Sequence, residues 1–327
     1  MFKKILYLTL LLFAVPYSLK AAQLKVALVL DKGGKDDKSF NTAAFRGATE
    51  AKEKLKIFLK EIEVSSDHLF EPAMRSFASK KFDLIIGIGF AQAETVKKLA
   101  KEMPDQKFAI IDAPVDAPNV AALLFEEHEG SYLVGYIAGL KTKTNSIGFV
   151  GGMDIPLIRR FEKAYSQGAK AAKKDVKVLI NYVGVTSDAW NNPTKAKELA
   201  QNQYSRGVDI VFAAAGASNN GVFDAAESFK KFAIGVDSNQ NWIKPGLILT
   251  SMLKRVDTAV FNTIEDLTEG TFKGGIKRFG LNSNSIDWAL DSYNEKLFTP
   301  DEIKKITTIK NDILAKKIQV VDYYKTK

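Results

Sequence analysis

The chain has 327 residues, of which 46% are hydrophobic and 26% charged, with a formal net charge of +9 and no cysteine. This ordinary composition excludes the disordered and fibrous classes, and the length suffices for two packed domains. Without cysteine there is no disulfide and no thiol chemistry, so packing must stabilise the fold.

The basic net charge permits a nucleic-acid or anionic-membrane partner. The lysines, however, are dispersed among acids along helical segments such as residues 50–63. They do not form a concentrated basic stripe interleaved with aromatic residues, which is the pattern typical of nucleic-acid binding. We therefore expect a solvated surface and no nucleic-acid partner.

Residues 1–22 differ from the rest of the chain. Two lysines precede an apolar run at residues 5–15, and small residues at Ala21 and Ala22 follow it. This pattern predicts a cleaved secretory signal peptide, because an apolar run of about eleven residues is too short to span a membrane. Lys20 lies close to the cleavage point, so an uncleaved anchor is the alternative. Because no lipobox cysteine is present, we predict a freely diffusing protein of the periplasm.

From residue 24 onward, short runs rich in Val, Ile and Leu alternate with helical patterns. Strands are predicted at residues 24–30, 61–65, 84–88, 108–112 and 121–125, and helices at residues 40–56, 70–79 and 91–102. Repeated strand and helix units of this length imply right-handed crossovers and a parallel sheet. These elements form a first α/β lobe.

The alternation starts again after residue 129. Strands are predicted at residues 146–150, 176–183, 208–214 and 232–236, and helices at residues 158–173, 193–206 and 219–230. A helix at residues 255–268, shorter pieces at 275–281 and 286–290, and a helix at 300–316 complete the chain. The fold class is therefore α/β, with two lobes that can close about a hinge in the manner of a periplasmic binding protein.

Residues 31–41 read Asp-Lys-Gly-Gly-Lys-Asp-Asp-Lys-Ser-Phe-Asn and join the first strand to the first helix. Gly33 and Gly34 allow positive φ and close backbone approach, while Asp37 or Ser39 can cap the helix. In open parallel sheets, ligands bind at this carboxyl edge. The loop is therefore the first candidate for a binding site.

Phe40 and Asn41, which end this loop, offer a flat apolar face beside a hydrogen-bonding amide. Such a pair suits a ring that carries hydroxyls or amides. The alternative is that Phe40 is a core residue of the first helical turn and that the acids merely solvate a turn.

Motifs for enzymatic chemistry are weak. Gly34-Lys35 is followed by Asp36 rather than by the Ser or Thr of a phosphate-binding P-loop, and the acids of the loop lack the Gly and Glu of an EF-hand. Gly87 and Gly89 match only part of a dinucleotide fingerprint, and a Gly-x-Ser-x-Gly elbow is missing. His68 and His128 have no partners at metal-ligand spacing, and we interpret His128 as a solvated residue near the crossing between lobes. We therefore expect no metal, no cofactor and no enzyme.

One polar, small or aromatic residue follows each of several predicted strands. These residues are Asp31, Phe90, Asp112, Gly216 and Asp237. Each could cap a helix on its own. Because parallel strands end at one edge of their sheet, we expect them to converge on a single cleft.

The loop sequence Asp-Asp-Lys-Ser-Phe-Asn after a Gly-Gly turn resembles the signature of the basic membrane protein (BMP) family, the substrate-binding proteins of nucleoside ABC transporters. The resemblance recurs, in the family's order, at residues 108–112, 129–133, 235–237, 251–255 and 289–299. It implies a type I periplasmic binding protein whose chain crosses three times between lobes. On that basis we expect residues 23–127 and 253–285 in the first lobe, and residues 128–252 and 286–327 in the second.

The resemblance also implies the ligand-binding residues. In this family, the base lies between two aromatic rings, acids and an amide read its edge, and an acid and a lysine hold the ribose. Matched motif by motif, the residues are Asp31, Phe40, Asn41, Asp112, Trp190, Gly216, Asp237 and Lys254. Trp190 stands where the family often carries Phe. Surface positions are the alternatives for Trp190 and Lys254.

The resemblance implies a monomeric receptor that captures a nucleoside of the adenosine, guanosine or inosine class and presents it to an ABC permease in the inner membrane. The predicted acids disfavour a charged nucleotide. Two alternatives stay open. One is another aromatic solute such as riboflavin, and the other is a nucleoside-processing enzyme that uses the Asp cluster.

Overall fold

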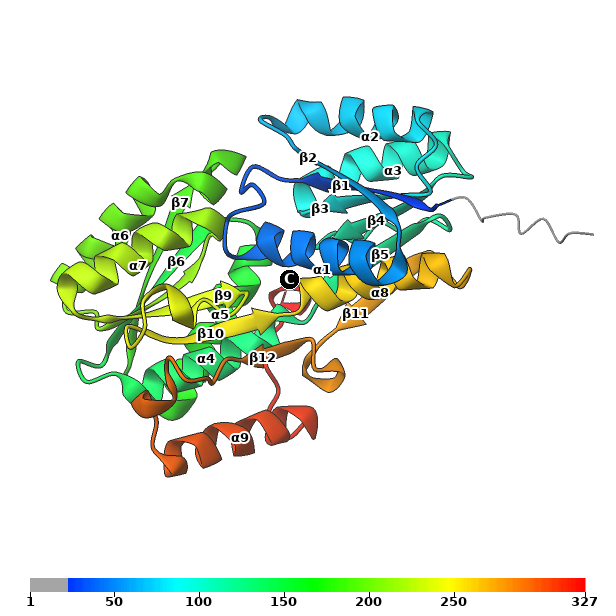
Figure 1. The fold of residues 1–327 in the computed structure, drawn as a ribbon. Coiled ribbons are helices and arrows are strands. Elements are labelled where there is room, and N and C mark those ends of the chain that lie inside the picture. Colours follow the sequence, from blue (N-terminus) through cyan, green and yellow to red (C-terminus); the bar gives the residue numbers. More distant parts are fainter. Residues whose placement is uncertain (1–22, 327) are drawn as a thin grey trace, which may run out of the picture.

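The structure is a computed structural model, and it describes residues 23–326. The predicted signal peptide lies outside the described residues. Two six-stranded sheets, each flanked by helices, form two lobes that lie side by side (Figure 1). None of the helices in the described part of the chain is both long and apolar enough to cross a membrane.

The first sheet has the strand order β11-β5-β4-β3-β1-β2, and all its neighbouring strands are parallel. Its strands are β1 (Lys25–Leu30), β2 (Phe58–Glu63), β3 (Leu84–Ile88), β4 (Lys107–Ile111), β5 (Val120–Phe125) and β11 (Gly275–Phe279). Its helices are α1 (Phe40–Leu55), α2 (Phe70–Ser79), α3 (Ala93–Glu102) and α8 (Val256–Thr268). Helices α1 and α8 pack together on one face, while α2 and α3 cover the other (Figure 1).

The second sheet has the order β12-β10-β9-β8-β6-β7 and is parallel except for β12, which pairs antiparallel with β10. Its strands are β6 (Ser146–Met153), β7 (Lys177–Gly184), β8 (Ile210–Ala214), β9 (Phe232–Asp237), β10 (Ile248–Lys254) and β12 (Ile286–Trp288). Its helices are α4 (Glu127–Lys141), α5 (Pro156–Ala172), α6 (Pro193–Ser205), α7 (Asn219–Phe229) and α9 (Pro300–Leu314). The pairs α4 with α5 and α6 with α7 are in close contact.

Burial explains why the central strands read as continuous apolar runs. Every residue of β3 and β8 is buried, because helices cover both faces of each sheet. The edge strand β2 instead alternates, with Phe58 and Ile62 exposed. The chain passes between the two sheets after β5, after β10 and after β11. These passages form the hinge, and the carboxyl ends of the strands face the opposite lobe.

Candidate functional site

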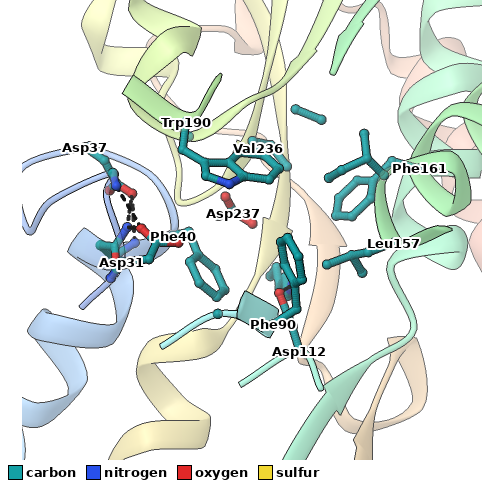
Figure 2. Close-up of a pocket in the computed structure, with 17 residues that line it drawn as sticks. Asp31, Asp37, Phe40, Phe90, Asp112, Leu157, Phe161, Trp190, Val236 and Asp237 are labelled. Atoms are coloured by element: carbon teal, nitrogen blue, oxygen red, sulfur yellow. Dashed lines mark hydrogen bonds and ion pairs between the residues drawn. The ribbon is translucent and has the colours of Figure 1, made fainter. Parts of the chain in front are cut away.

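The loop after β1 is held by a compact set of hydrogen bonds. Asp31 Oδ1 accepts hydrogen bonds from the Gly33 backbone N–H at 2.8 Å and from Asn41 Nδ2 at 2.6 Å. Asp37 Oδ2 accepts from the backbone N–H and the Nδ2 of Asn41, at 2.9 and 3.0 Å. Gly34 adopts φ 72°, as its glycine identity predicts. The amide of Asn41 thus fixes Asp31 at the edge of the cleft (Figure 2).

Asp37, rather than Ser39, caps helix α1. Its carboxylate accepts hydrogen bonds from the backbone N–H groups of Asn41 and Thr42, whereas Ser39 makes no side-chain cap bond. The Ser39 hydroxyl instead reaches the opposite lobe and donates to Asp237 Oδ2 at 2.6 Å. Of the two sequence-based alternatives for the cap, only Asp37 is correct.

All eight residues predicted for the site line one pocket between the lobes. Asp31, Phe40, Asn41 and Asp112 come from the first lobe, and Trp190, Gly216, Asp237 and Lys254 come from elements of the second lobe or from the crossing. The side chains of Phe40 and Trp190 project toward one cavity from opposite lobes (Figure 2). That these residues contact a ligand stays a prediction.

Trp190 is supported by two glycines. A Cβ on Gly152 would lie 2.1 Å from Cζ3 of the indole, so only glycine leaves room for this ring. Gly216, with φ 61°, follows β8 and approaches the Trp190 carbonyl oxygen. The surface alternative for Trp190 is therefore wrong, since the ring packs inside the cleft.

Sequence reasoning did not include a further wall of the pocket. Leu157, Ile158 and Phe161 line it from the first turns of α5. Phe90, which was expected in the cleft because it follows a predicted strand, lines the pocket too and meets Trp190 edge-on at 6.2 Å between ring centroids. Helix α5 begins at Pro156, two residues before the predicted start. A proline after a strand is a common first helical residue, and it was the available signal.

Burial is the largest influence on the pKa of three of the four acids that line the pocket. It raises the pKa of Asp31 to about 7 and that of Asp237 to about 6. Burial also raises the pKa of Asp112, although the ammonium of Lys254 opposes the shift. Asp112 and Asp237 both lie at strand ends with positive φ, 67° and 64°, a conformation that Asp tolerates better than most residues.

Lys254 is buried, so its surface alternative is also wrong. Its side chain is 2% exposed, and its Nζ lies 2.6 Å from Asp112 Oδ2 and 3.1 Å from Glu127 Oε1. Burial lowers the pKa of Lys254, but Asp112, Glu127 and Asp237 outweigh that effect and hold it above its ordinary value. Lys254 is therefore a charged donor beside the pocket.

The interpretation of His128 as solvated is wrong. The residue is 8% exposed, and burial together with Arg160 lowers its pKa to about 4. Within residues 23–326, His128, Glu126 and Asp322 form the one group whose atoms could share a metal ion. Arg160 already donates to both carboxylates, so the position is occupied by a guanidinium.

Two α/β lobes that meet over a pocket lined by aromatic rings and carboxylates define a class of protein, namely one that encloses a small solute between its lobes. A family model described as "ABC transporter substrate-binding protein PnrA-like" matches residues 24–323. The chain belongs to this family, the BMP family of ABC transporter substrate-binding proteins.

Relatives and solved structures agree with this assignment. The chain is 34% identical to the "ABC transporter nucleoside-binding protein BmpA" of Lactococcus lactis, over 91% of this chain and 89% of the relative. A crystal structure of ABC transporter solute-binding proteins from Aeropyrum pernix has a TM-score of 0.85 at 30% identity, over 91% of this chain and 93% of the other. The two-lobe α/β fold predicted from the sequence is confirmed.

The comparisons contradict the predicted location. Relatives from Pyrococcus species are named lipoproteins, and one from Pyrococcus horikoshii is 35% identical over 86% of this chain and 76% of its own length. A lipoprotein is attached to a membrane, whereas we predicted a freely diffusing protein from the missing cysteine. That prediction is wrong. It inferred free diffusion from the missing cysteine alone.

Proposed function

We propose that this protein captures a purine nucleoside in the cleft between its lobes and delivers it to the permease of an ABC transporter. One observation carries the proposal. Phe40 and Trp190, from opposite lobes, line the same pocket as four carboxyl groups and one ammonium. The name of the Lactococcus relative supports the ligand class.

The aromatic pair explains how a base would be held. Stacking of a base on an aromatic ring contributes roughly 1 to 3 kcal/mol and depends little on which base is bound. Because Phe40 and Trp190 belong to different lobes, a flat ring between them would also favour closure. Stacking alone supplies affinity, so the polar groups must supply discrimination.

Asp31 is placed to read the edge of the base. Its Oδ1 is already used by Gly33 and Asn41, while Oδ2 accepts no hydrogen bond from the described residues. Both amide hydrogens of Asn41 point to Asp31 and Asp37. In this arrangement Asn41 orients Asp31, and the free carboxyl oxygen of Asp31 meets the ligand.

The other polar groups suit a sugar. Asp237 can accept hydrogen bonds from a ribose diol, and Lys254 can donate to the same ring. Four acids line the pocket, and they would oppose a phosphate because like charges in a buried site repel each other. A free nucleoside is therefore favoured over a nucleotide.

The experiment is to identify the small molecule that the purified protein releases on denaturation, by mass spectrometry. Calorimetry with adenosine, guanosine, inosine, uridine and riboflavin then ranks the ligands. Tighter binding of a purine nucleoside supports the proposal, whereas preference for riboflavin or absence of nucleoside binding overturns it. Release of free base on incubation would instead indicate an enzyme.

A further inference from the structure

Lys254 lies where the two lobes and the crossing segments meet. Its ammonium lies 5.1 Å from the centroid of the Phe40 ring and 5.0 Å from that of Phe125. An ammonium has three hydrogens, and two of them face Asp112 Oδ2 and Glu127 Oε1. The third remains available to the pocket that Lys254 lines.

Asp112 keeps one oxygen free in this arrangement. Its Oδ1 is buried and has no hydrogen-bond partner among residues 23–326, although Oδ2 binds Lys254 at 2.6 Å. A buried carboxyl oxygen without a partner is costly, so a ligand group that donates to it would be stabilised. If the ammonium of Lys254 contacted both oxygens of Asp112, Oδ1 would no longer be available to a ligand.

Glu127 holds the ammonium of Lys254 from a second side. It is the first residue of α4, it is 1% exposed, and its Oε1 draws the ammonium away from a bidentate contact with Asp112. Glu127 is itself fixed, because its Oε2 accepts a hydrogen bond from Arg160 Nη1 at 2.5 Å. Arg160, also 1% exposed, donates as well to the Phe125 carbonyl oxygen and to Asp322.

We propose that Glu127, held by Arg160, is a positioning residue for ligand binding. It directs one hydrogen of Lys254 into the pocket and leaves Asp112 Oδ1 free for the sugar hydroxyls of the ligand. The inference rests on the proposed nucleoside function, and it assigns sugar recognition to a residue that does not line the pocket.

The test compares calorimetric affinities of Glu127→Gln and wild-type protein for a purine nucleoside and for its free base. We expect the substitution to weaken the nucleoside roughly ten- to hundredfold, as for one charge-assisted hydrogen bond, and to change the affinity for the free base much less. Glu129→Gln is the matched control. Glu129 lies in the same helical turn but accepts a hydrogen bond from the Leu281 N–H, and this variant should bind like wild type.

Two further measurements separate positioning from a structural role. In a Lys254→Met background, Glu127→Gln should cause no additional selective loss, because its effect acts through the ammonium. The charge of Glu127 also raises the pKa of Asp112, so the pH profile of nucleoside affinity should move to lower pH in Glu127→Gln. If Glu127→Gln does not fold, Glu127→Asp serves, since it withdraws the carboxylate while keeping the charge.

The outcomes are distinct from a failure of the proposed function. If wild-type protein binds no nucleoside, the proposed function fails. If wild-type protein binds nucleosides but Glu127→Gln weakens nucleoside and free base equally, or neither, the positioning role is overturned while the function stands.

Discussion

Burial keeps acidic groups of the pocket partly protonated near neutral pH. It raises the pKa of Asp31 to about 7, so this carboxyl is a mixture of acid and carboxylate near neutral pH. Each form offers a ligand a different hydrogen-bonding pattern. The residue that we propose to face the base is therefore also a residue whose protonation responds to pH.

In the arrangement of the lobes seen in the structure, Asp31 makes the free energy of unfolding depend on pH. Between its unfolded pKa of 3.8 and about 7, the folded protein binds more protons than the unfolded chain, so the free energy of unfolding falls as pH rises. His128 has the opposite effect, because its lowered pKa makes the free energy of unfolding rise with pH. This contribution stops changing above its unfolded pKa of 6.5. Between about pH 6.5 and about pH 8, we expect the free energy of unfolding, measured with denaturant, to fall as pH rises. Each acid whose pKa is raised by burial contributes at most about 1.4 kcal/mol per pH unit to this fall.

Asp31→Asn is the diagnostic variant for this effect. It removes the titration while keeping an oxygen that can accept from Gly33 and Asn41. The pH slope of the free energy of unfolding should become shallower in this variant. An unchanged slope would show that Asp31 is not responsible.

Phe40 and Asp237 should differ in how they treat ligands. Phe40→Ala should weaken a nucleoside and its free base alike, by roughly 1 to 3 kcal/mol, because stacking concerns the base. Asp237→Asn should weaken the nucleoside by roughly 1.5 to 3 kcal/mol and the base less, since a free base offers no diol. Calorimetry on both ligands measures the difference.

Ser39→Ala is the control for Asp237. The Ser39 hydroxyl donates to Asp237 across the cleft, so part of any Asp237 effect could come from closure. Loss of a closing contact should weaken every ligand equally. If Asp237→Asn weakens the binding of nucleoside and free base equally, the assignment of Asp237 to the sugar is therefore wrong.

At the scale of elements, the sequence defined the first lobe well. The predicted bounds of β3 and α2 agree with the structure, because an apolar run in one and a 3.6-residue pattern in the other are strong local signals. β2 was predicted three residues too late. It is an edge strand that exposes Phe58 and Ile62, so the usual rule that apolar residues are buried misleads there.

Helix α4 was not predicted, and its glycines explain why. Gly130, Gly135 and Gly139 disfavour a helix in isolation. They are required by packing, since a Cβ on Gly135 would lie 2.1 Å from the Tyr165 carbonyl oxygen of α5. The close contact between α4 and α5 is a tertiary fact that no local pattern contains.

In the site, too, the residues with a signal in the sequence were predicted and the others were not. The eight predicted residues lie together because a resemblance of motifs identified them, and the acids follow strand ends as topology requires. The sequence did not predict the pocket residues Leu157, Ile158 and Phe161, because apolar residues at the start of a helix cannot be distinguished from ordinary core residues. Strand β10, which carries Lys254, was also not predicted, so the burial of this lysine could not be foreseen.

Gly152 in β6 provides a test of how the second lobe supports its aromatic ring. Gly152→Ala should displace the indole of Trp190 and weaken all aromatic ligands, because the new Cβ would overlap the ring. In a Trp190→Phe background, the smaller ring leaves room, and the same substitution should cost less. Calorimetry measures the cost in both backgrounds, and indole fluorescence reports the displacement of the ring in the protein that keeps Trp190. Equal costs in the two backgrounds would contradict this account.

At the scale of the molecule, polar contacts join the two lobes directly. Lys32 Nζ lies 2.6 Å from Asp188 Oδ1, and Ser187 Oγ donates to Asp67 Oδ2 at 2.7 Å. Ser238 and Gln240 of the second lobe donate to the backbone carbonyl oxygens of Ser39 and Lys38. The structure therefore shows the closed arrangement of the two lobes.

The Lys32–Asp188 pair should contribute little and without selectivity. Asp188 is 73% exposed, so Asp188→Asn should weaken every ligand by less than about 1 kcal/mol, and the loss should shrink at high salt. Small-angle scattering should show compaction on adding nucleoside to both proteins. A selective or salt-independent loss would indicate that Asp188 acts by another route.

The cap of helix α1 has a consequence for the speed of release. Asp37 satisfies the helix N-terminus from within its own lobe, so Ser39 is free to contact Asp237. When the lobes separate, the Ser39 hydroxyl exchanges Asp237 for water while the helix keeps its cap. The barrier to opening thus contains no partial unwinding of α1, and the residence time of a ligand can be adjusted at Ser39 without altering the unfolding rate of the lobe.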